Sequence, residues 1–265
     1  MKTFQSLLKL SLTSTLAVTV FLCGCGGGAP SSESSLVPTV QAKLPPFPAT
    51  TAKASVAGKV TFDGAIPAPK KIRVSGDAIC EKAHPGSAMA SEDLLVAADK
   101  SLQNVIVWVK QGADQWEFPV PATPVKVSQK GCQYIPHVLG VMANQGVEIS
   151  SEDATTHNVH FVGKANQEFN MTQKQGGKEL KVFKRAEIAK IKCDIHSWMG
   201  AQILVAYHPF YQVTGKDGKF SLGKLPAGKY TIEAWHEKLG SSVQEIDLKD
   251  GETKAINFAF KAAAK

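Results

Sequence analysis

The sequence lacks the patterns that mark several common classes of protein. No long helical period of apolar residues occurs, whereas glycine (22) and proline (14) are plentiful, which favours a β-rich fold. The Gly-x-Ser-x-Gly and His-Glu-x-x-His motifs of many hydrolases and metalloproteases are absent. So is the Cys-x-x-Cys-His motif of haem attachment. The sequence offers no catalytic constellation, and we expect a protein that is not an enzyme.

The chain has a modest excess of positively charged residues, and these residues are not clustered in the sequence. The formal net charge is +7, and the loss of Lys2 and Lys9 with the N-terminal segment described below lowers it by two, to +5. The lysines and arginines form no dense cluster with interleaved aromatic residues, which is the pattern of a nucleic-acid-binding surface. We therefore expect no nucleic-acid partner.

The N-terminus has the pattern of an export signal. Two lysines in MKTFQSLLKL precede the apolar run SLTSTLAVTVFL, as in a secretory signal peptide, and this run is short for a membrane-spanning helix of about 20 residues. At its end, Leu22-Cys23-Gly24-Cys25 resembles a bacterial lipobox. The resemblance implies that residues 1–24 are a lipoprotein signal peptide and that Cys25 carries a lipid. We expect an exported protein, periplasmic or on the cell surface, whose lipid anchor makes a membrane its partner.

Residues 25–54 are rich in proline and small side chains and carry almost no charge. This composition is typical of a flexible linker, whose end-to-end distance at this length is roughly 30 Å. We predict a tether that holds the rest of the chain away from the membrane.

From Ala54 onward the apolar runs are short and alternate with polar residues, as in SVAGKVTFDG, NVIVWVKQG, HNVHFVG and KYTIEAW. A period of two is typical of half-buried β-strands, and pairs such as Asp63-Gly64 and Asp217-Gly218 mark turns between them. Many short strands with regular turns favour β-sandwiches. We predict an all-β fold with two sandwiches.

Residues 124–207 carry a series of short motifs in a recognisable order. They are, in chain order, Tyr134-x-Pro136, Val141 through Gly146 to Val147, Asp153, His157-Asn158-Val159 and Cys193-x2-His196-x2-Met199. This order resembles the cupredoxins, the blue-copper domains of plastocyanin and amicyanin, and the spacing of the last motif is similar to that of amicyanin. The resemblance covers about a third of the chain and implies a Greek-key β-sandwich.

The same resemblance implies the metal and its ligands. It implies one type 1 copper ion as cofactor, held by His157, Cys193, His196 and Met199, which supply two imidazoles, a thiolate and a weak thioether. Zinc would need four strong ligands, and methionine is a poor fourth. His160 competes with His157, but a position three residues along a strand faces the other side.

Three neighbours of the ligands receive roles from the resemblance. We call the loop that carries Cys193, His196 and Met199 (residues 193–199) the ligand loop. Asn158 is expected to hydrogen-bond near this loop and to hold it rigid. In cupredoxins the loop histidine lies near the surface, within an apolar patch that docks redox partners, and Ile195 and Trp198 flank His196. Trp198 either belongs to such a docking patch, where aromatic residues are favoured, or covers the copper and packs against the second sandwich.

The cysteines form two groups. Cys23 leaves with the signal peptide and Cys25 is lipidated, so that Cys80, Cys132 and Cys193 remain. Exported proteins meet oxidising conditions, in which two of three cysteines tend to pair. If Cys193 is a copper ligand, as the resemblance implies, Cys80 and Cys132 are left as the pair.

Two histidines follow these cysteines closely, His84 after Cys80 and His137 after Cys132. A second metal site is one interpretation. For an exported protein we favour the other interpretation, in which the two cysteines form a disulfide and the histidines bind no metal.

Residues 55–123 and 208–262 together resemble the carboxypeptidase-regulatory-like domain, a small prealbumin-like β-sandwich. The C-terminal part has the signature DGKFSLGKLPAGKYT, and the strand that matches the family's first strand, residues 58–64, lies before the cupredoxin-like unit. We predict one sandwich split by the insertion of the other. Two units in tandem is the alternative.

Together these resemblances imply a lipid-anchored type 1 copper protein that transfers single electrons to or from a redox partner protein. A copper store, chaperone or sensor would use the same ligands with exchangeable metal. A carbohydrate-binding or protein-binding sandwich without a redox role is the third possibility.

Overall fold

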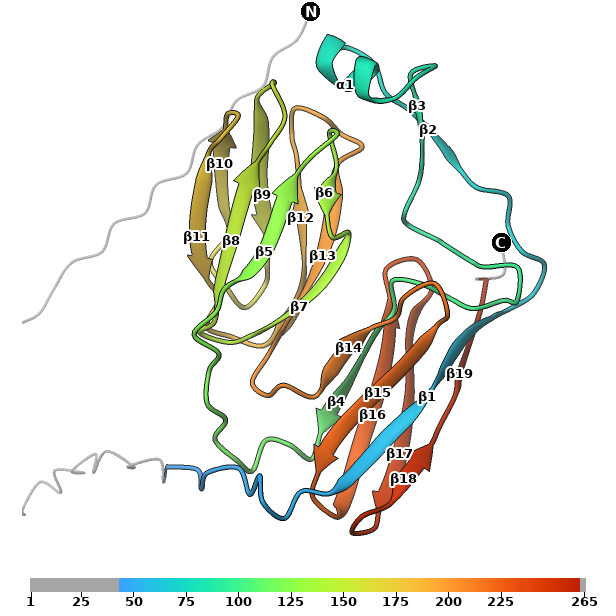
Figure 1. Cartoon of the computed structure of the whole chain (residues 1–265), viewed down its shortest axis with the longest axis vertical. Coiled ribbons are helices and arrows are strands. Elements are labelled where there is room, and N and C mark those ends of the chain that lie inside the picture. Colours follow the sequence, from blue (N-terminus) through green and yellow to red (C-terminus); the bar gives the residue numbers. More distant parts are fainter. Residues whose placement is uncertain (1–42, 263–265) are drawn as a thin grey trace, which may run out of the picture. The chain divides into compact units, whose positions relative to one another are not determined.

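The computed structural model describes residues 43–262 (Figure 1). The predicted signal peptide (residues 1–24), the lipidation site Cys25 and most of the predicted tether lie outside the described residues. Within the described residues no helix is long and apolar enough to cross a membrane. The one helix there, α1 (Ala78–Ala83), is short, and the other elements are strands. The all-β prediction is confirmed.

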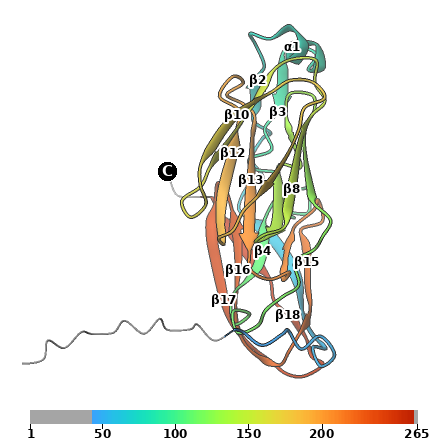
Figure 2. The same ribbon diagram turned by 90° about the vertical axis from the view of Figure 1, so that its left-hand side faces the viewer.

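One β-sandwich is built from the two ends of the described chain, and we call it the split sandwich (Figures 1 and 2). Its first sheet consists of β15 (Lys219–Leu225), β1 (Ala54–Asp63), β18 (Thr253–Ala255) and β19 (Phe258–Lys261). Its second sheet consists of β14 (Tyr211–Val213), β4 (Ile106–Gln111), β16 (Gly228–His236) and β17 (Gly240–Leu248). Alternate apolar residues of both sheets, such as Val60 and Ile232, form one buried core, as expected for strands with one inward face.

The other sandwich, which we call the inserted sandwich, lies between β4 and β14 in the sequence. Its first sheet consists of β10 (Phe169–Gln173), β9 (His157–Val162), β12 (Glu187–Lys192), β13 (Gly200–Ala206) and β7 (Val138–Met142). Its second sheet consists of β11 (Lys178–Val182), β8 (Gly146–Ser151), β5 (Val125–Gln129) and β6 (Tyr134–Ile135). Its core is separate and includes Val127, Ile149, Phe161 and Ile203.

The part of the predicted tether that the structure describes is packed, which corrects the predicted boundary at residue 54. Phe47 stacks on Phe118, with ring centroids 4.8 Å apart, and meets Phe210 edge-on at 5.4 Å. Its backbone N–H donates to the carbonyl of Glu117. An aromatic side chain buries a large apolar area, and Phe47 therefore attaches this stretch to the split sandwich.

Residues 71–90 correct a second boundary, because the prediction assigned them to the split sandwich. They comprise β2 (Lys71–Arg73), α1 and β3 (Ala88–Ala90), and we call them the cap segment. Strands β2 and β3 pair only with each other. Val74, Cys80 and Met89 are buried in the core of the inserted sandwich. Burial of these three side chains, rather than strand pairing, decides where the cap segment lies.

A short set of contacts links the two sandwiches. Ile106 of β4 forms a small buried cluster with Val138 and Leu204 of the inserted sandwich. Beside it, the Glu237 carboxylate lies in hydrogen-bond contact with His137 Nε2 and accepts a hydrogen bond from Gln202 Nε2 at 3.2 Å. The inserted sandwich is thus joined to the split sandwich along its β7 and β13 strands.

Glu187 provides a test of local stability through its pKa. Its carboxylate accepts hydrogen bonds from the backbone N–H groups of Lys164 (2.7 Å), Ala165 (3.0 Å) and Asn166 (2.7 Å). Burial raises the pKa of Glu187, but these hydrogen bonds outweigh it and hold the pKa below its ordinary value of 4.5. A carboxyl group whose pKa is lower in the folded protein than in the unfolded chain stabilises the fold at pH values above its unfolded-state pKa. This stabilisation is lost as the pH falls through the folded-state pKa.

We therefore expect Glu187→Gln to lower the free energy of unfolding most at pH values above about 5, and less and less as the pH falls below the ordinary pKa. Urea unfolding between pH 3 and pH 7 measures the difference. Glu245→Gln is the matched control, because Glu245 is exposed and makes no hydrogen bond through its side chain in the described part of the chain. A difference for Glu187→Gln that does not change with pH would contradict the assignment.

Candidate metal centre

Four side chains meet at one end of the inserted sandwich. His157 is the first residue of β9, Cys193 follows the last residue of β12, and Met199 precedes the first residue of β13. Strand β12 pairs with both β9 and β13, so the strand ends lie side by side. His196 is on the loop between β12 and β13. All four side chains are buried, with at most 3% of their surface exposed.

The donor atoms of three of these residues converge on one point. His157 Nδ1 and His196 Nδ1 are 3.0 Å apart, and Cys193 Sγ is 3.9 Å from His196 Nδ1. All three donor atoms lie within 4.8 Å of one another. Metal bonds to imidazole nitrogen and thiolate sulfur are about 2.0 to 2.3 Å long, so these separations fit ligands of a single ion. The residues present therefore fit a copper ion, for which thiolate and imidazole are suitable donors.

The ligand loop is closed by two backbone hydrogen bonds. The N–H of Cys193 donates to the carbonyl of Met199 at 3.2 Å, and the N–H of Met199 donates to the carbonyl of His196 at 2.9 Å. The Met199 side chain is buried in the same apolar cluster as Cys193. The short spacing Cys-x2-His-x2-Met thus forms a tight turn that keeps all three residues at the end of the sandwich.

The surroundings of Cys193 favour the thiolate. The backbone N–H groups of His196 (3.3 Å) and Asn158 (3.4 Å) point at its sulfur. Burial raises the pKa of the Cys193 thiol, but a hydrogen bond with His157 and the backbone donors outweigh it, and the pKa lies below the ordinary value. The deprotonated form is the one that binds a metal.

Each of the two candidate ligand histidines has a carboxylate on its outer nitrogen. His157 Nε2 is 2.8 Å from Asp153 Oδ2, and His196 Nε2 is 3.3 Å from Asp77 Oδ2. Burial lowers the pKa of His157, but contacts with Cys193 and Asp153 raise it above the ordinary value. For His196, burial and the nearby His157 lower the pKa. A carboxylate on the outer nitrogen orients the ring and leaves the inner nitrogen for the metal.

Asp77 was missed by the sequence analysis, and its position explains why. It is the residue before α1, where Oδ1 accepts from the N–H groups of Ile79 and Cys80 as a helix cap. Its other oxygen, Oδ2, accepts a hydrogen bond from Thr155 Oγ1 at 2.6 Å. Asp77 is 119 residues from His196. A capping aspartate is common at helix starts, so the sequence carries no signal for the second role.

Asn158 connects β9 to the start of the ligand loop. Its Oδ1 accepts a hydrogen bond from the N–H of Asp194 at 3.0 Å, and its Nδ2 donates to Asn170 Oδ1. His160 lies outside the donor cluster. Its ring is 2.8 Å from Asp194 Oδ2 and 2.6 Å from Glu168 Oε1.

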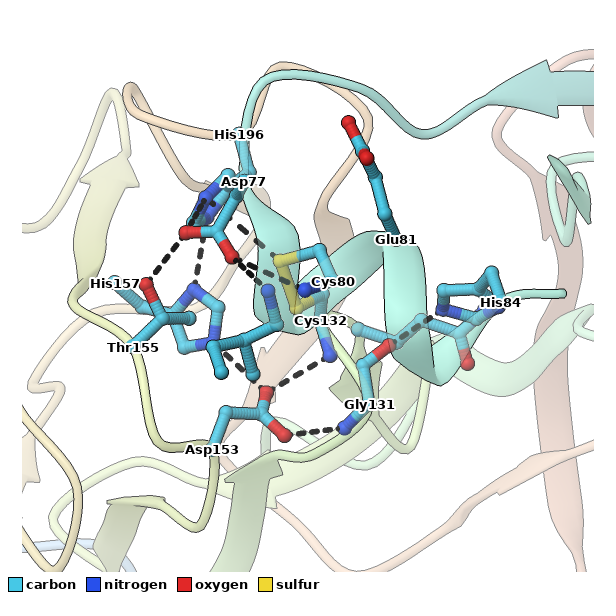
Figure 3. Close-up of a disulfide and its surroundings, with 12 residues drawn as sticks. Asp77, Cys80, Glu81, His84, Gly131, Cys132, Asp153, Thr155, His157 and His196 are labelled. Atoms are coloured by element: carbon cyan, nitrogen blue, oxygen red, sulfur yellow. Dashed lines mark hydrogen bonds and ion pairs between the residues drawn. A yellow bond between two sulfur atoms is a disulfide. The ribbon is translucent and has the colours of Figure 1, made fainter. Parts of the chain in front are cut away.

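A disulfide joins the cap segment to the inserted sandwich next to the metal centre (Figure 3). Cys80 of α1 is bonded to Cys132 in the turn between β5 and β6. Cys80 Sγ lies 3.8 Å from His196 Nε2. The cap segment therefore covers the outer edge of the His196 ring, and this differs from the near-surface position that the resemblance implied.

Trp198 and Ile195 lie on either side of His196 in the sequence but in different surroundings. The Trp198 ring is half-buried, 5.1 Å from the His196 ring between centroids, and its Nε1 donates to the carbonyl of Cys132 at 3.1 Å. Ile195 is 53% exposed. Trp198 thus packs beside the disulfide and the metal centre, while Ile195 remains on the surface.

The histidines near the disulfide have local partners. His84 Nε2 is 2.7 Å from the carbonyl of Gly131, and His137 Nδ1 is 3.0 Å from the carbonyl of Gly200. Because Cys80 and Cys132 are bonded to each other, neither supplies a thiolate, and the described residues show no second thiolate site.

Comparison with known proteins yields structural similarity only. No family model matches the chain, and no curated protein matches it. Among solved structures, the copper-containing nitrite reductase from Thermus scotoductus is 20% identical, with a TM-score of 0.31 over 38% of this chain and only 25% of the reductase. The M98A mutant of amicyanin with Cu(I) is 22% identical, with a TM-score of 0.29 over 32% of this chain and 85% of amicyanin. A purple cupredoxin from Nitrosopumilus maritimus is 18% identical, with a TM-score of 0.28 over 31% of this chain and 99% of that protein.

Proposed function

We propose that residues 124–207 form a cupredoxin domain that binds one type 1 copper ion and transfers single electrons. The observation that carries the proposal is the convergence of the buried donors of His157, Cys193 and His196 within 4.8 Å of one another. Met199, at the end of the same loop, would supply the weak thioether. Two imidazoles, one thiolate and a weak thioether are the donor set of blue-copper electron-transfer sites. Copper supplies the couple between Cu(II) and Cu(I).

The protein's own residues have three tasks in this mechanism. Asp153 and Asp77 hold the imidazole rings in fixed orientations, so that the inner nitrogens would be held in place for a metal. The N–H groups that point at Cys193 stabilise its negative charge. Burial of all four ligands excludes water from the position of the metal. Four protein donors are available to one ion, and the protein is proposed to be an electron carrier rather than an enzyme.

The remaining parts of the proposal concern location and partners. The lipobox-like sequence at Cys25 supports an exported protein anchored to a membrane. Its redox partner is then another protein of the same compartment. Storage or delivery of copper would require ready exchange of the metal, and the cap segment over His196 argues for slow exchange.

An optical titration tests the type 1 site. Cu(II) is added to the purified protein, and we expect intense visible absorption from charge transfer between the Cys193 thiolate and copper. The Cys193→Ser variant is expected to lose this absorption entirely, because serine offers no thiolate. Met171→Leu is a control, since Met171 lies on β10, outside the ligand loop, and we expect the full absorption to be retained. A wild-type protein that stays colourless with Cu(II) would overturn the proposal.

A further inference from the structure

The outer edge of the His196 ring is closed to a partner protein. Asp77 Oδ2 and Cys80 Sγ lie 3.3 and 3.8 Å from His196 Nε2, and His196 is 3% exposed. A partner that approached this edge would meet the cap segment, which the disulfide attaches to the inserted sandwich. A docking surface with short access to the metal has to lie elsewhere.

A cleft reaches the metal centre from a different face. It has a volume of about 630 Å³, and its lining includes the ligands Cys193 and Met199 together with Trp198. Strand β2 of the cap segment, the end of β12, the ligand loop and the turn between β16 and β17 form its walls. The cleft thus borders two of the four proposed ligands.

Most of the acidic residues in the cleft are already engaged by neighbours. Asp194 is paired with Lys192 at 2.9 Å, and Asp93 with Lys238 at 3.2 Å. Glu237 is in hydrogen-bond contact with a histidine of the inserted sandwich. The two carboxylates paired with lysines therefore contribute little free negative charge to the cleft.

The basic residues are less engaged. Lys70, Lys71, Arg73 and Lys190 line the cleft, are exposed, and have no ion-pair partner within residues 43–262. Glu92 is the one carboxylate of the lining without an ionic partner among those residues. The cleft thus has a surplus of positive charge, spread over residues 70–73 and β12.

We propose that this cleft docks an acidic segment of the redox partner and is the route by which electrons reach the copper. The inference rests on the proposed function. The four cations are long side chains spread along the rim rather than buried around one point, so they match a chain of carboxylates better than one small anion. Complementary charge also steers association and fixes the orientation of two proteins. Trp198 and Met199, which line the cleft, would then contact the docked segment beside the proposed ligands.

Binding of an acidic peptide to the copper-free protein tests the docking. A fluorescently labelled peptide of ten glutamates is titrated at low and at high salt. We expect salt-sensitive binding, because exposed charges are screened within about 10 Å at 0.1 M salt. The double variant Lys71→Glu/Arg73→Glu should weaken binding at least about tenfold. Both side chains are exposed on β2, and neither is a ligand.

The matched control changes the same charge at another place. Lys126 and Lys178 are exposed on β5 and β11 and do not line the cleft, and Lys126→Glu/Lys178→Glu should leave peptide binding within about twofold of wild type. An equal loss in both double variants would overturn the proposal, since net charge alone would then explain the binding. Binding of hexacyanocobaltate(III) but not of the peptide would assign the cleft to small anions and overturn it as well.

Electron transfer to small complexes tests the route. The reduced copper protein is oxidised by hexacyanoferrate(III), an anion, and by a cationic cobalt(III) polypyridyl complex. We expect Lys71→Glu/Arg73→Glu to slow the first reaction and to speed the second, with the control variant unchanged. Equal rates in both variants would overturn the route. The peptide titration needs no copper, so a failure of the type 1 site and a failure of the docking surface give different results.

Discussion

Replacing Cys80 and Cys132 together by serine is expected to lower the free energy of unfolding by about 4 kcal/mol and to speed the loss of copper. The two cysteines are 52 residues apart in the sequence, and closing a loop of this length restricts the unfolded chain by about that amount. In the folded protein the same bond attaches α1 beside His196. Without it the cap segment retains its buried apolar contacts, the hydrogen bonds of Asp77 and the contact between His84 and the Gly131 carbonyl.

Two measurements separate these effects. Urea unfolding of the copper-free protein gives the change in stability, and transfer of copper to an excess of chelator gives the rate of loss. Wild-type protein treated with a thiol reductant serves as the second variant and should behave as the double serine variant does. A lower stability with an unchanged transfer rate would show that the cap segment stays over His196 without the disulfide.

The second large effect is expected at Gly58, in the middle of β1. A Cβ atom there would lie 1.6 Å from the backbone oxygen of Ile256 and 3.0 Å from the ring of Phe220. The first of these contacts is with backbone and cannot be relieved by a change of rotamer. We therefore expect Gly58→Ala to destabilise the protein by about 3 kcal/mol or more, because strand β1 has to move away from the segment that joins β18 to β19.

Gly223→Ala is the matched control for this prediction. Gly223 lies on β15, the neighbour of β1, and a Cβ atom there would meet nothing within 4 Å. Alanine costs less conformational entropy than glycine in a strand, so this variant should be neutral or more stable by up to about 1 kcal/mol. Urea unfolding compares the two variants. Equal and small changes in the free energy of unfolding of the two variants would show that β1 does not pack against residue 256. The arrangement of strands described for the split sandwich would then be wrong.

The copper centre gives a second readout of the Gly58 variant. Gly58 belongs to β1 of the split sandwich, whereas all four proposed ligands belong to the inserted sandwich. At temperatures where the variant is still folded, the charge-transfer absorption with Cu(II) should equal that of the wild type. Loss of absorption in a folded Gly58→Ala protein would mean that the two sandwiches depend on each other more closely than their contacts indicate.

The alternating apolar pattern was sufficient to predict the all-β fold. Runs such as HNVHFVG and KYTIEAW have a period of two, and they form β9 and β16. The donors of the ligand loop were also visible, because Cys193, His196 and Met199 lie within seven residues and the turn between two paired strands keeps them together. Local chemistry and a local turn are properties that a sequence displays directly.

Two segment boundaries were not visible. Residues 43–54 look like linker, yet Phe47 packs on Phe118 and Phe210. The cap segment lies between two stretches of the split sandwich, yet Val74, Cys80 and Met89 are buried in the inserted sandwich. In both cases a few apolar side chains pack against residues that are distant in the sequence. Isolated contacts of this kind leave no periodic pattern in the sequence.

The sequence by itself therefore determined the strand pattern, the donor types and their spacing, because these depend on neighbouring residues. Only the tertiary structure decided what surrounds the donors. Asp77 reaches His196 across 119 residues, and Lys71, Arg73 and Lys190 come to one cleft beside Cys193. These positions follow from the path of the cap segment and its disulfide, which result from packing of the whole chain rather than from any local preference.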